Sequence, residues 1–268
     1  MVAVVAMIIW RITLPSMMKA LLWVFGLVGG VVVLAVSVEK ANEDWPVLFR
    51  AVRFQLVFIL IWLSPLLVAL AVGLAGVHRR SSGEQQALFC SGVGPNQLAP
   101  VAGFVGLFVA VLGFAASEWL VPIIAVWDSP AWMWTAQGPV RVLDGLLVPL
   151  DLTQPVHSVA SGHIEYVHPR VASLVAVLSG TDLTSITEQY SRLSRPLACV
   201  GFSLMGLYFG QVRQPIVWIA SLGGVFIIFD IIAWSLGAQG QLNPIFAGSV
   251  LAWLWCVPVF WMTRQPST

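Results

Sequence analysis

Long apolar runs separated by short polar segments extend along most of this chain. A helix that crosses the hydrocarbon core of a bilayer needs about 20 mostly apolar residues. Runs of roughly this length lie at residues 21–38, 56–77, 98–121, 196–210, 215–237 and 245–262. The fourth run is short and needs the turn before it to reach full length. The pattern predicts an all-α membrane protein with six transmembrane helices.

A hydrophilic segment divides these runs into two sets of three. Within it, short extended-looking runs at 140–143, 146–150 and 164–167 are separated by glycines and prolines, a pattern typical of small strands. Residues 184–193 predict a polar helix that leads into the fourth span. We therefore expect three parts: a first transmembrane half at 1–125, a small β-containing insert at 126–193 and a second transmembrane half at 194–268.

Composition supports lipid as the solvent for most of the chain. Only 9% of the 268 residues are charged, 59% are hydrophobic and the mean hydropathy is +0.90. There are 13 tryptophans but only 3 tyrosines, and indole rings favour the headgroup boundary. A net charge of +1 without a basic patch argues against binding of nucleic acid. Cys90, Cys199 and Cys256 are scattered, so they indicate neither a disulfide framework nor a zinc site.

The distribution of lysine and arginine between the loops predicts the orientation of the chain. With a cytoplasmic N-terminus, Glu84 is the only acid of the short cytoplasmic segments, whose basic residues are Arg11, Lys19, Arg79, Arg80, Arg213 and Arg264. The outward segments contain more acids than bases. Residues 2–10 lack the basic flank and cleavage site of a secretory signal and predict an interfacial helix. We expect both termini on the cytoplasmic side and the insert on the outer side.

The loop after the second span carries the most specific local pattern. Ser81-Ser-Gly-Glu84 has the form of a capping box, in which the Ser81 hydroxyl accepts from the Glu84 amide and the Glu84 carboxylate reaches back. It predicts a short helix within residues 81–92. Gly92 is suited to a left-handed stop at the end of this helix.

This short helix would present Leu88 and Phe89 to the cytosol. An exposed apolar face on so short a helix is unfavourable alone, and it becomes favourable when another protein covers it. The alternative is that the face lies in the lipid boundary and Glu84 only caps the helix.

The same loop resembles the lipopolysaccharide-export permeases of ABC transporters (the LptF/LptG family, also called YjgP/YjgQ). The resemblance lies in Glu84-Gln-Gln-Ala-Leu-Phe-Cys-Ser-Gly-Val-Gly-Pro-Asn-Gln-Leu-Ala-Pro100, followed by an apolar span that ends in Glu118-Trp-Leu-Val-Pro122. Further motifs follow in the family's order: Arg195-Pro-Leu197, Gly206-Leu-Tyr-Phe-Gly210, and Gly240-Gln-Leu-Asn-Pro244 with Ala252-Trp253. The resemblance covers all six predicted spans.

The resemblance implies a non-catalytic permease subunit of an ATP-driven exporter in the bacterial inner membrane. A cytosolic ABC ATPase dimer would bind and hydrolyse ATP-Mg, so this chain would need no cofactor. A second permease, a copy or a homologue, would complete a cavity for lipopolysaccharide or a related lipid, which passes to a periplasmic bridge protein. Carried over to this chain, the ATPase-coupling role falls on Glu84, Ala87, Leu88 and Gly92.

One departure from the family concerns the outward insert. Family members carry a β-jellyroll there of roughly twice the size of residues 126–193. Eight strands of about five or six residues with their turns do not fit into this segment. The insert is therefore either a reduced sheet or a docking site for a domain of another protein.

Charged residues near the outer ends of the spans are candidates for the path of the cargo. Glu118 and Asp230 lie within predicted spans, where an ionised side chain costs about 2.5 to 3.5 kcal/mol on insertion scales unless it faces a cavity, water or a partner. We expect them to line the lipid path or to pair with Arg50 or Arg53; the alternative is a structural bond near the interface. Lys40, Arg50 and Arg53 are suited to contact phosphates of an anionic glycolipid, with ordinary headgroups and neighbouring acids as alternatives.

Two glycine pairs predict close packing of helices. Gly26-x-x-x-Gly30 and Gly206-x-x-x-Gly210 have the spacing that lets two helix backbones approach. The alternative for Gly206 is that it only loosens the end of the fourth span.

Other chemistry finds little support in the sequence. His157, His163 and His168 match no established spacing of metal ligands, so no metal site is predicted. The sequence has no phosphate-binding loop with a lysine and no arguable Ser-His-Asp set, so the chain itself is not expected to be an enzyme. The alternatives to a permease are a non-transporting membrane scaffold of the same fold and a membrane enzyme that acts on lipid.

Overall fold

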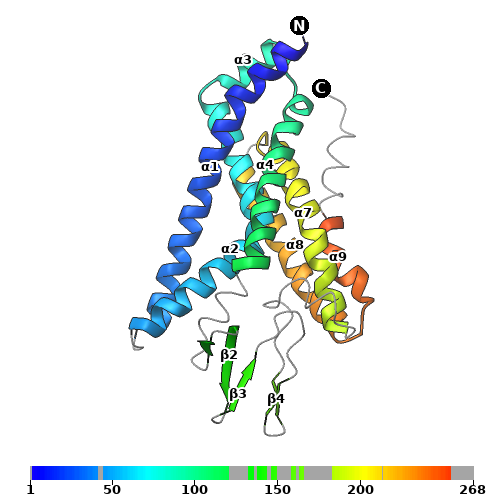
Figure 1. The fold of residues 1–268 in the computed structure, drawn as a ribbon. Helices are drawn as coiled ribbons and strands as arrows, with labels where there is room; N and C mark the ends of the chain where they lie inside the picture. The colour runs from blue at the N-terminus through cyan, green and yellow to red at the C-terminus, as the bar shows by residue number, and fades with distance from the viewer. Residues whose placement is uncertain are drawn as a thin grey trace.

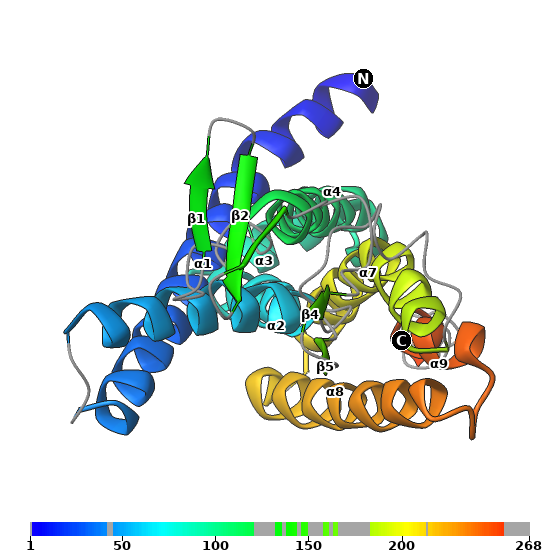
Figure 2. The same cartoon turned by 60° about the horizontal axis from the view of Figure 1, so that its bottom comes forward.

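A computed structural model describes the chain at residues 2–41, 45–120, 132–135, 138–143, 146–149, 158–160, 163–165, 183–212 and 214–254. The helices are α1 (Val2–Glu39), α2 (Trp45–Ser81), α3 (Glu84–Cys90), α4 (Pro95–Ala115), the π-helical turn η1 (Ala116–Leu120), α7 (Leu183–Phe209), α8 (Pro215–Ala238) and α9 (Pro244–Leu254). The long helices alternate in direction and form one bundle (Figure 1). Within it, α7 contacts α2, α4, α8 and α9 (Figure 2).

Four of the described helical segments are long and apolar enough to cross a membrane: Trp10–Glu39, Ala51–Ser81, Asn96–Glu118 and Pro215–Ala238. The chain is therefore a helical membrane protein. α7 has 27 residues, which is a sufficient length, but its first half carries several charges. α9 has 11 residues, and the rest of the last predicted span, residues 255–262, lies outside the described residues. The total of six spans stays a prediction.

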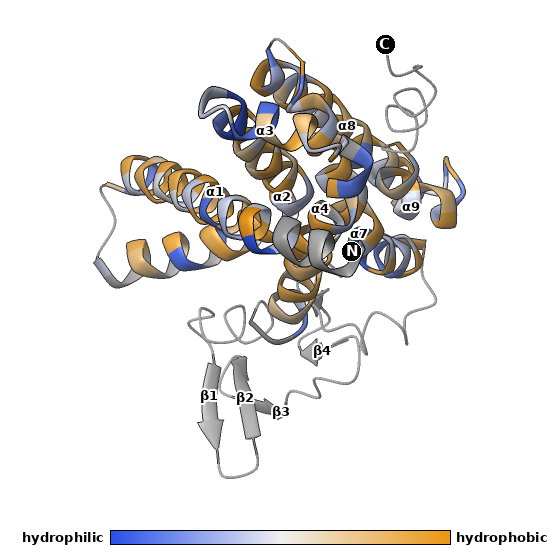
Figure 3. Cartoon of the chain, turned by 90° about the horizontal axis from the view of Figure 1, so that it is seen from above, coloured by the Kyte–Doolittle hydropathy of each residue, from blue (hydrophilic) through white to orange (hydrophobic). Residues whose placement is uncertain are grey.

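Apolar side chains face outward along these helices. Leu22 and Trp23 on α1 are 72% and 71% exposed, and Ile228 and Phe229 on α8 are 58% and 56% exposed. In Figure 3, hydrophobic residues extend along the helices, whereas hydrophilic residues are prominent around α3. Monomeric soluble proteins rarely expose contiguous apolar patches of this extent, so this surface is suited to lipid.

α1 is one continuous helix, where the sequence predicts an interfacial helix and a separate span. Its 38 residues include both segments, and Pro15 lies inside without ending it. Proline is tolerated in membrane helices when other groups satisfy the backbone carbonyl that its missing N–H leaves without a partner.

Pro65 in α2 shows how such a carbonyl is satisfied. Because Pro65 has no N–H, the Ile61 carbonyl four residues earlier loses its helical partner. The Ser64 hydroxyl donates to this carbonyl at 2.7 Å. Ser64 is only 2% exposed, so water does not reach the site to take over this role.

α2 and α7 cross with their backbones close together because glycines line both helices. A Cβ added at Gly206 would overlap the backbone of Ala69, and one added at Gly76 would lie 3.3 Å from the Gly210 Cα. The predicted role of the Gly206 and Gly210 pair in close packing is confirmed. The pair in α1 makes no such approach within the described chain, since a Cβ at Gly26 or Gly30 would meet nothing within 4 Å there.

The core lies between α1, α2, α4 and α7. Its largest fully buried side chains include Phe202 and Met205 of α7, with valines of α2 and α4 around them. Gly106 brings α4 close to α7, since an added Cβ there would lie 2.7 Å from the Cys199 carbonyl oxygen. The core thus fixes α4 and α7 against each other.

Short strands connect η1 with α7, at the end of the bundle opposite α3 (Figures 1 and 2). β1 (Trp132–Thr135), β2 (Gly138–Leu143) and β3 (Leu146–Pro149) form one antiparallel sheet, and β4 (Ser158–Ala160) pairs with β5 (His163–Glu165). Arg141 of β2 lies opposite Trp132 and Val148. α7 begins at Leu183, inside the segment predicted as the insert, so the predicted polar helix and fourth span form one helix. A separate β-rich domain at 126–193 stays a prediction.

Candidate functional site

α3 lies at one end of the bundle, on the connection between α2 and α4 (Figure 1). Gly83 precedes it with φ +78° and Gly92 follows it with φ +82°, in the left-handed region that favours glycine. At its C-terminus the Gly92 N–H donates to the Phe89 carbonyl and the Val93 N–H to the Leu88 carbonyl, both at 2.9 Å. These bonds form a Schellman motif, so the predicted stop at Gly92 is confirmed.

The start of α3 differs from the prediction. α2 continues to Ser81, whose hydroxyl donates to the His78 carbonyl at 2.8 Å instead of accepting from the Glu84 amide. Gly83 is the N-cap residue and makes no side-chain cap bond. The predicted capping box is therefore wrong, because serine near a helix end bonds equally well to a carbonyl of its own preceding turn. The helix itself covers Glu84–Cys90, which lies within the predicted range 81–92.

Three of the four residues assigned to ATPase coupling face outward. Glu84, Ala87 and Gly92 are exposed, whereas Leu88 is half-buried and packs against the hydrophobic core. Phe89, next to Leu88, is 44% exposed. Leu88 thus holds α3 on the bundle, while Phe89 and its polar neighbours form the outer face.

A pocket with an empty volume of about 300 Å³ lies beneath α3, between the ends of α2 and α7. Arg79 lines it and is 2% exposed; its Nε donates to the Ala75 carbonyl at 3.2 Å, and its Nη1 has no hydrogen-bond partner among the described residues. The Gln85 Oε1 lines the same pocket and is buried without a partner in the same set. An unsatisfied donor and acceptor in one pocket favour a bound water between them.

The basic residues predicted to meet the cargo lie near the end of α1 and the start of α2, which project beyond the rest of the bundle (Figures 1 and 2). Lys40 follows α1 and is half-buried. Arg53 is half-buried on α2, with its Cζ 6.0 Å from the centroid of the Phe49 ring. Arg50 lies on α2, and its side chain is outside the described part of the structure.

Glu118 forms an ion pair with α7. The Nη1 of Arg192 donates to the Glu118 Oε1 at 2.8 Å. The predicted pairing of Glu118 with Arg50 or Arg53 stays a prediction, because the Arg50 side chain lies outside the described residues. Glu118 and Arg192 are far apart in the sequence, and the contact of α4 with α7 brings them together.

Arg192 is the centre of a buried network that joins three helices. Its Nε donates to the Glu188 Oε1 at 3.1 Å, one turn earlier on α7. The other carboxylate oxygen of Glu188 accepts from the indole Nε1 of Trp234 on α8 at 2.9 Å. The side chains of Arg192, Glu188 and Glu118 are 3%, 2% and 13% exposed. η1, α7 and α8 are therefore tied together by charge-assisted hydrogen bonds.

The energetics make Arg192 the critical member of this network. Removal of an ion from water costs several kcal/mol, and only close oppositely charged groups with good hydrogen bonds offset that cost. Among the side chains that the structure describes, Arg192 bonds two carboxylates, those of Glu118 and Glu188. Loss of the guanidinium would leave both carboxylates buried without this compensation.

Asp230, the other predicted intramembrane acid, is on α8 and is 5% exposed. It lies four residues before Trp234, and residues with this spacing share one face of a helix. Asp230 therefore belongs to the face of α8 that carries the contact with Glu188. This burial is the environment expected of an intramembrane carboxylate.

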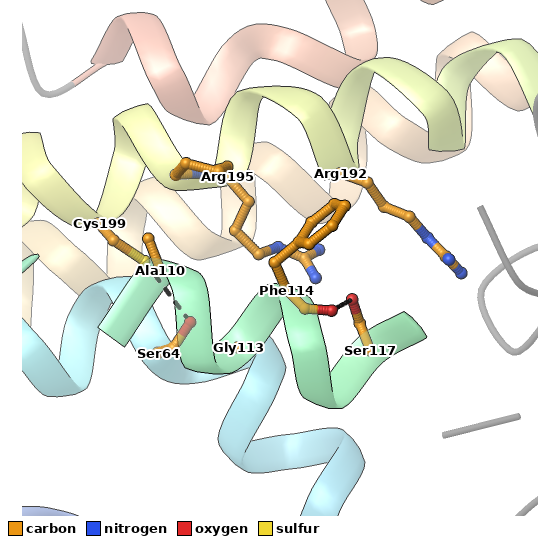
Figure 4. Close-up of a pocket in the computed structure, with 9 residues that line it drawn as sticks. Ser64, Ala110, Gly113, Phe114, Ser117, Arg192, Arg195 and Cys199 are labelled. Carbon is orange, nitrogen blue, oxygen red and sulfur yellow. Dashed lines mark hydrogen bonds between the residues drawn. The ribbon is translucent and has the colours of Figure 1, made fainter. Parts of the chain in front are cut away.

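A second, partly open pocket lies where α2, α4 and α7 meet; the empty space in it, including the space open to the outside, is about 270 Å³ (Figure 4). The residues that line it include Ser64, Gly113, Ser117, Arg192, Arg195 and Cys199. The Cζ of Arg195 lies 5.0 Å from the centroid of the Trp62 ring, which is a cation–π geometry. Two arginines of α7 thus border one pocket within the helical bundle.

Glu188, Arg192 and Arg195 are absent from the site predicted from the sequence. A local signal exists for two of them, because Glu188 and Arg192 are four residues apart on a helix. Their third partner, Glu118, is 74 residues from Arg192, so no local pattern connects them. Arg195 belongs to a motif quoted above, but its sequence neighbours do not indicate a pocket.

No group of three or more His, Cys, Asp or Glu side chains is arranged to hold a metal ion within the described ranges. His163 is in β5, and His157 and His168 lie outside the described residues. Cys90 is exposed and Cys199 buried, both as free thiols, and Cys256 lies outside the described residues.

Comparison with known proteins gives no relative from which a role can be transferred. No family model and no curated protein matches the chain. The resemblance to the lipopolysaccharide-export permeases therefore rests on the quoted motifs, and the function has to be argued from the geometry.

Proposed function

We propose that the chain is a permease subunit of an ATP-driven ABC exporter that moves lipopolysaccharide or a related lipid out of the inner membrane. The observation that carries the proposal is the exposed face of α3 at one end of an apolar bundle. There Phe89 is 44% exposed beside exposed Glu84 and Ala87, a surface suited to a cytosolic ATPase. The motifs shared with lipopolysaccharide-export permeases support the same role.

The attachment of α3 is suited to transmit force. A helix of seven residues is not stable alone, so its contacts with the bundle determine its position. Leu88 packs against the core and the Schellman motif at Gly92 fixes the turn into α4. Close by, the Nη1 of Arg80 donates to the Gln211 carbonyl after α7 at 3.2 Å. An ATPase that displaces α3 would therefore move the ends of α2, α4 and α7.

α4 connects α3 with the buried ion network at the opposite end. η1 continues α4 and carries Glu118, which is bonded to Arg192 of α7. A shift of α4 relative to α7 would lengthen this 2.8 Å contact, because both groups are held on helix backbones. In this mechanism the network resists motion until ATP-driven closure supplies the energy.

The remaining components follow from the same proposal. The ATPase dimer binds ATP-Mg, and a second permease completes the cavity that shelters the lipid. A periplasmic bridge protein accepts the lipid on the outer side, where Lys40, Arg50 and Arg53 are candidates to contact its headgroup.

Co-purification of the full chain with an ABC ATPase tests the proposal. Phe89→Asp should weaken the complex by roughly tenfold or more, since exposed aromatic anchors often dominate an interface. Glu84→Ala should weaken it or uncouple ATP hydrolysis from transport. Leu183→Asp is the matched control: Leu183 is also 44% exposed, and it begins α7 at the opposite end of the bundle. This control should change the affinity by less than about twofold.

The opposite results distinguish the other functions. Equal behaviour of Phe89→Asp and Leu183→Asp, or no ATPase in the purified complex, would favour the non-transporting scaffold. Turnover of labelled lipid by the isolated chain without ATP would favour a membrane enzyme.

A further inference from the structure

Arg195 extends from α7 into the pocket between α2, α4 and α7, beside Phe114 (Figure 4). The Trp62 ring lies next to it, with the Cζ of Arg195 5.0 Å from the ring centroid. Within the described part of the chain, no carboxylate lies at ion-pair distance from Arg195 and no hydrogen-bond acceptor meets its guanidinium. Its five N–H donors are therefore directed at the ring and the pocket rather than at an anion.

The surroundings of this guanidinium belong to the membrane-spanning part of the bundle. Ser64 and Gly113, which line the pocket, lie within the candidate spans Ala51–Ser81 and Asn96–Glu118. A cation at such a depth is costly unless it meets an anion, water or a cavity. The cation–π contact offsets part of this cost, and an anionic oxygen would offset more.

The pocket opens toward the lipid-facing surface. Phe114 lines the pocket and is 37% exposed on the outside of α4. Gly113 leaves space on the same wall, since an added Cβ would meet only the Ser64 hydroxyl oxygen at 3.8 Å. Phe114 thus places one wall of the Arg195 pocket at the surface that faces the bilayer.

We propose that the Arg195 pocket binds the anionic headgroup of a lipid, through a phosphate or carboxylate oxygen that accepts hydrogen bonds from the guanidinium. Trp62 holds the plane of the guanidinium, and its N–H donors are left for the headgroup. Arg192 borders the same pocket but is already bonded to Glu118 and Glu188. An anionic headgroup adds the chemistry of the lipid to the proposed function. The identification of this lipid with the exported cargo rests on that proposed function.

Binding of labelled phosphatidic acid to the purified full chain in detergent tests this site. Diacylglycerol with the same acyl chains is the matched probe without a phosphate, and inorganic phosphate is the competitor. The wild-type chain should prefer phosphatidic acid by about tenfold or more, as expected for a charge-assisted hydrogen bond. Arg195→Gln should abolish this preference, and Arg195→Lys should keep part of it.

Two further variants separate charge from space. Gly113→Leu should fill the pocket and weaken phosphatidic acid binding although Arg195 is present. Arg80→Gln is the control, since Arg80 is exposed and bonds to the Gln211 carbonyl at the end of the bundle that carries α3. It should leave the preference unchanged, and Gly113→Leu decides the question if Arg195→Gln does not fold.

The proposal would be overturned if Arg195→Gln kept the full preference for phosphatidic acid over diacylglycerol. If Arg195→Gln does not fold, an unchanged preference in Gly113→Leu would overturn it. Displacement of the lipid by an equal concentration of inorganic phosphate would overturn the assignment of a lipid as the source of the anion. The measurement uses no ATPase, so its failure leaves the co-purification result standing, and the reverse also holds.

Discussion

Arg192 of α7 donates to Glu118 of η1 at 2.8 Å, across 74 residues of sequence. α4 extends from α3 to η1 at the opposite end of the bundle, and this contact joins η1 to α7. Because its members are buried, the contact is sensitive to any change of charge. This relationship leads to the first prediction.

Arg192→Met should lower the free energy of unfolding by about 3 to 5 kcal/mol, the cost of leaving buried charges without their partner. Unfolding of the purified chain by denaturant in detergent micelles measures this loss. Glu118→Gln and Glu188→Gln added to the variant should recover part of it, because the two side chains bonded to Arg192 then carry no charge. Arg80→Met, at an exposed position, should change stability by less than about 0.5 kcal/mol. If Arg192→Met also changed the free energy of unfolding by less than about 0.5 kcal/mol, the network would not stabilise the bundle.

Ser64→Ala should cost about 1 to 3 kcal/mol, since it leaves the Ile61 carbonyl before Pro65 without a donor. Ser203→Ala is the matched control. Ser203 is also buried and donates to the carbonyl three residues earlier, Val200, but no proline deprives that carbonyl of its helical partner. Thermal unfolding of both variants compares them directly. Equal losses of stability in the two variants would show that Pro65 does not make the Ile61 carbonyl depend on the Ser64 hydroxyl.

Gly206→Val should destabilise the bundle by about 1 to 3 kcal/mol or prevent its folding, because the added side chain meets the backbone of Ala69. Gly26→Val should have little effect on packing, since an added Cβ there meets nothing within 4 Å in the described chain. Thermal unfolding and size-exclusion profiles in detergent distinguish the two. A stable Gly206→Val variant would contradict the close crossing of α2 and α7.

Gly92→Ala should destabilise the end of α3 by about 1 to 2 kcal/mol, because an L side chain is disfavoured at φ +82°. Gly94→Ala is the control, with φ −83° and open space at its Cβ. Hydrogen exchange at the amides of α3 reports the effect locally. Faster exchange is expected in Gly92→Ala alone, and equal exchange in both variants would argue against the Schellman turn as the anchor of α3.

Much of the fold follows from local sequence. α8 has 24 residues that are almost all apolar, with Asp230 as its one charged residue, and such length and composition are sufficient to predict a span. The stop at Gly92 is also a local property, since glycine alone pays little for a left-handed conformation. The start of α3 is less determined by the sequence. The Ser81 hydroxyl can bond either to the Glu84 amide or to the His78 carbonyl, and it bonds to the His78 carbonyl because α2 continues to Ser81.

The sequence by itself determined the class of the protein, the positions of its long helices and the short helix α3. It did not determine which polar groups meet: Glu118 with Arg192, Glu188 with Trp234, and Arg195 with Trp62 depend on how separate helices pack. It also did not show that Gly206 and Gly210 lie at a helix crossing, whereas Gly26 and Gly30 have no neighbour within 4 Å of an added Cβ in the described chain. The physical reason is that lipid and protein interior are both apolar, so the faces of a membrane helix look alike until its neighbours are placed.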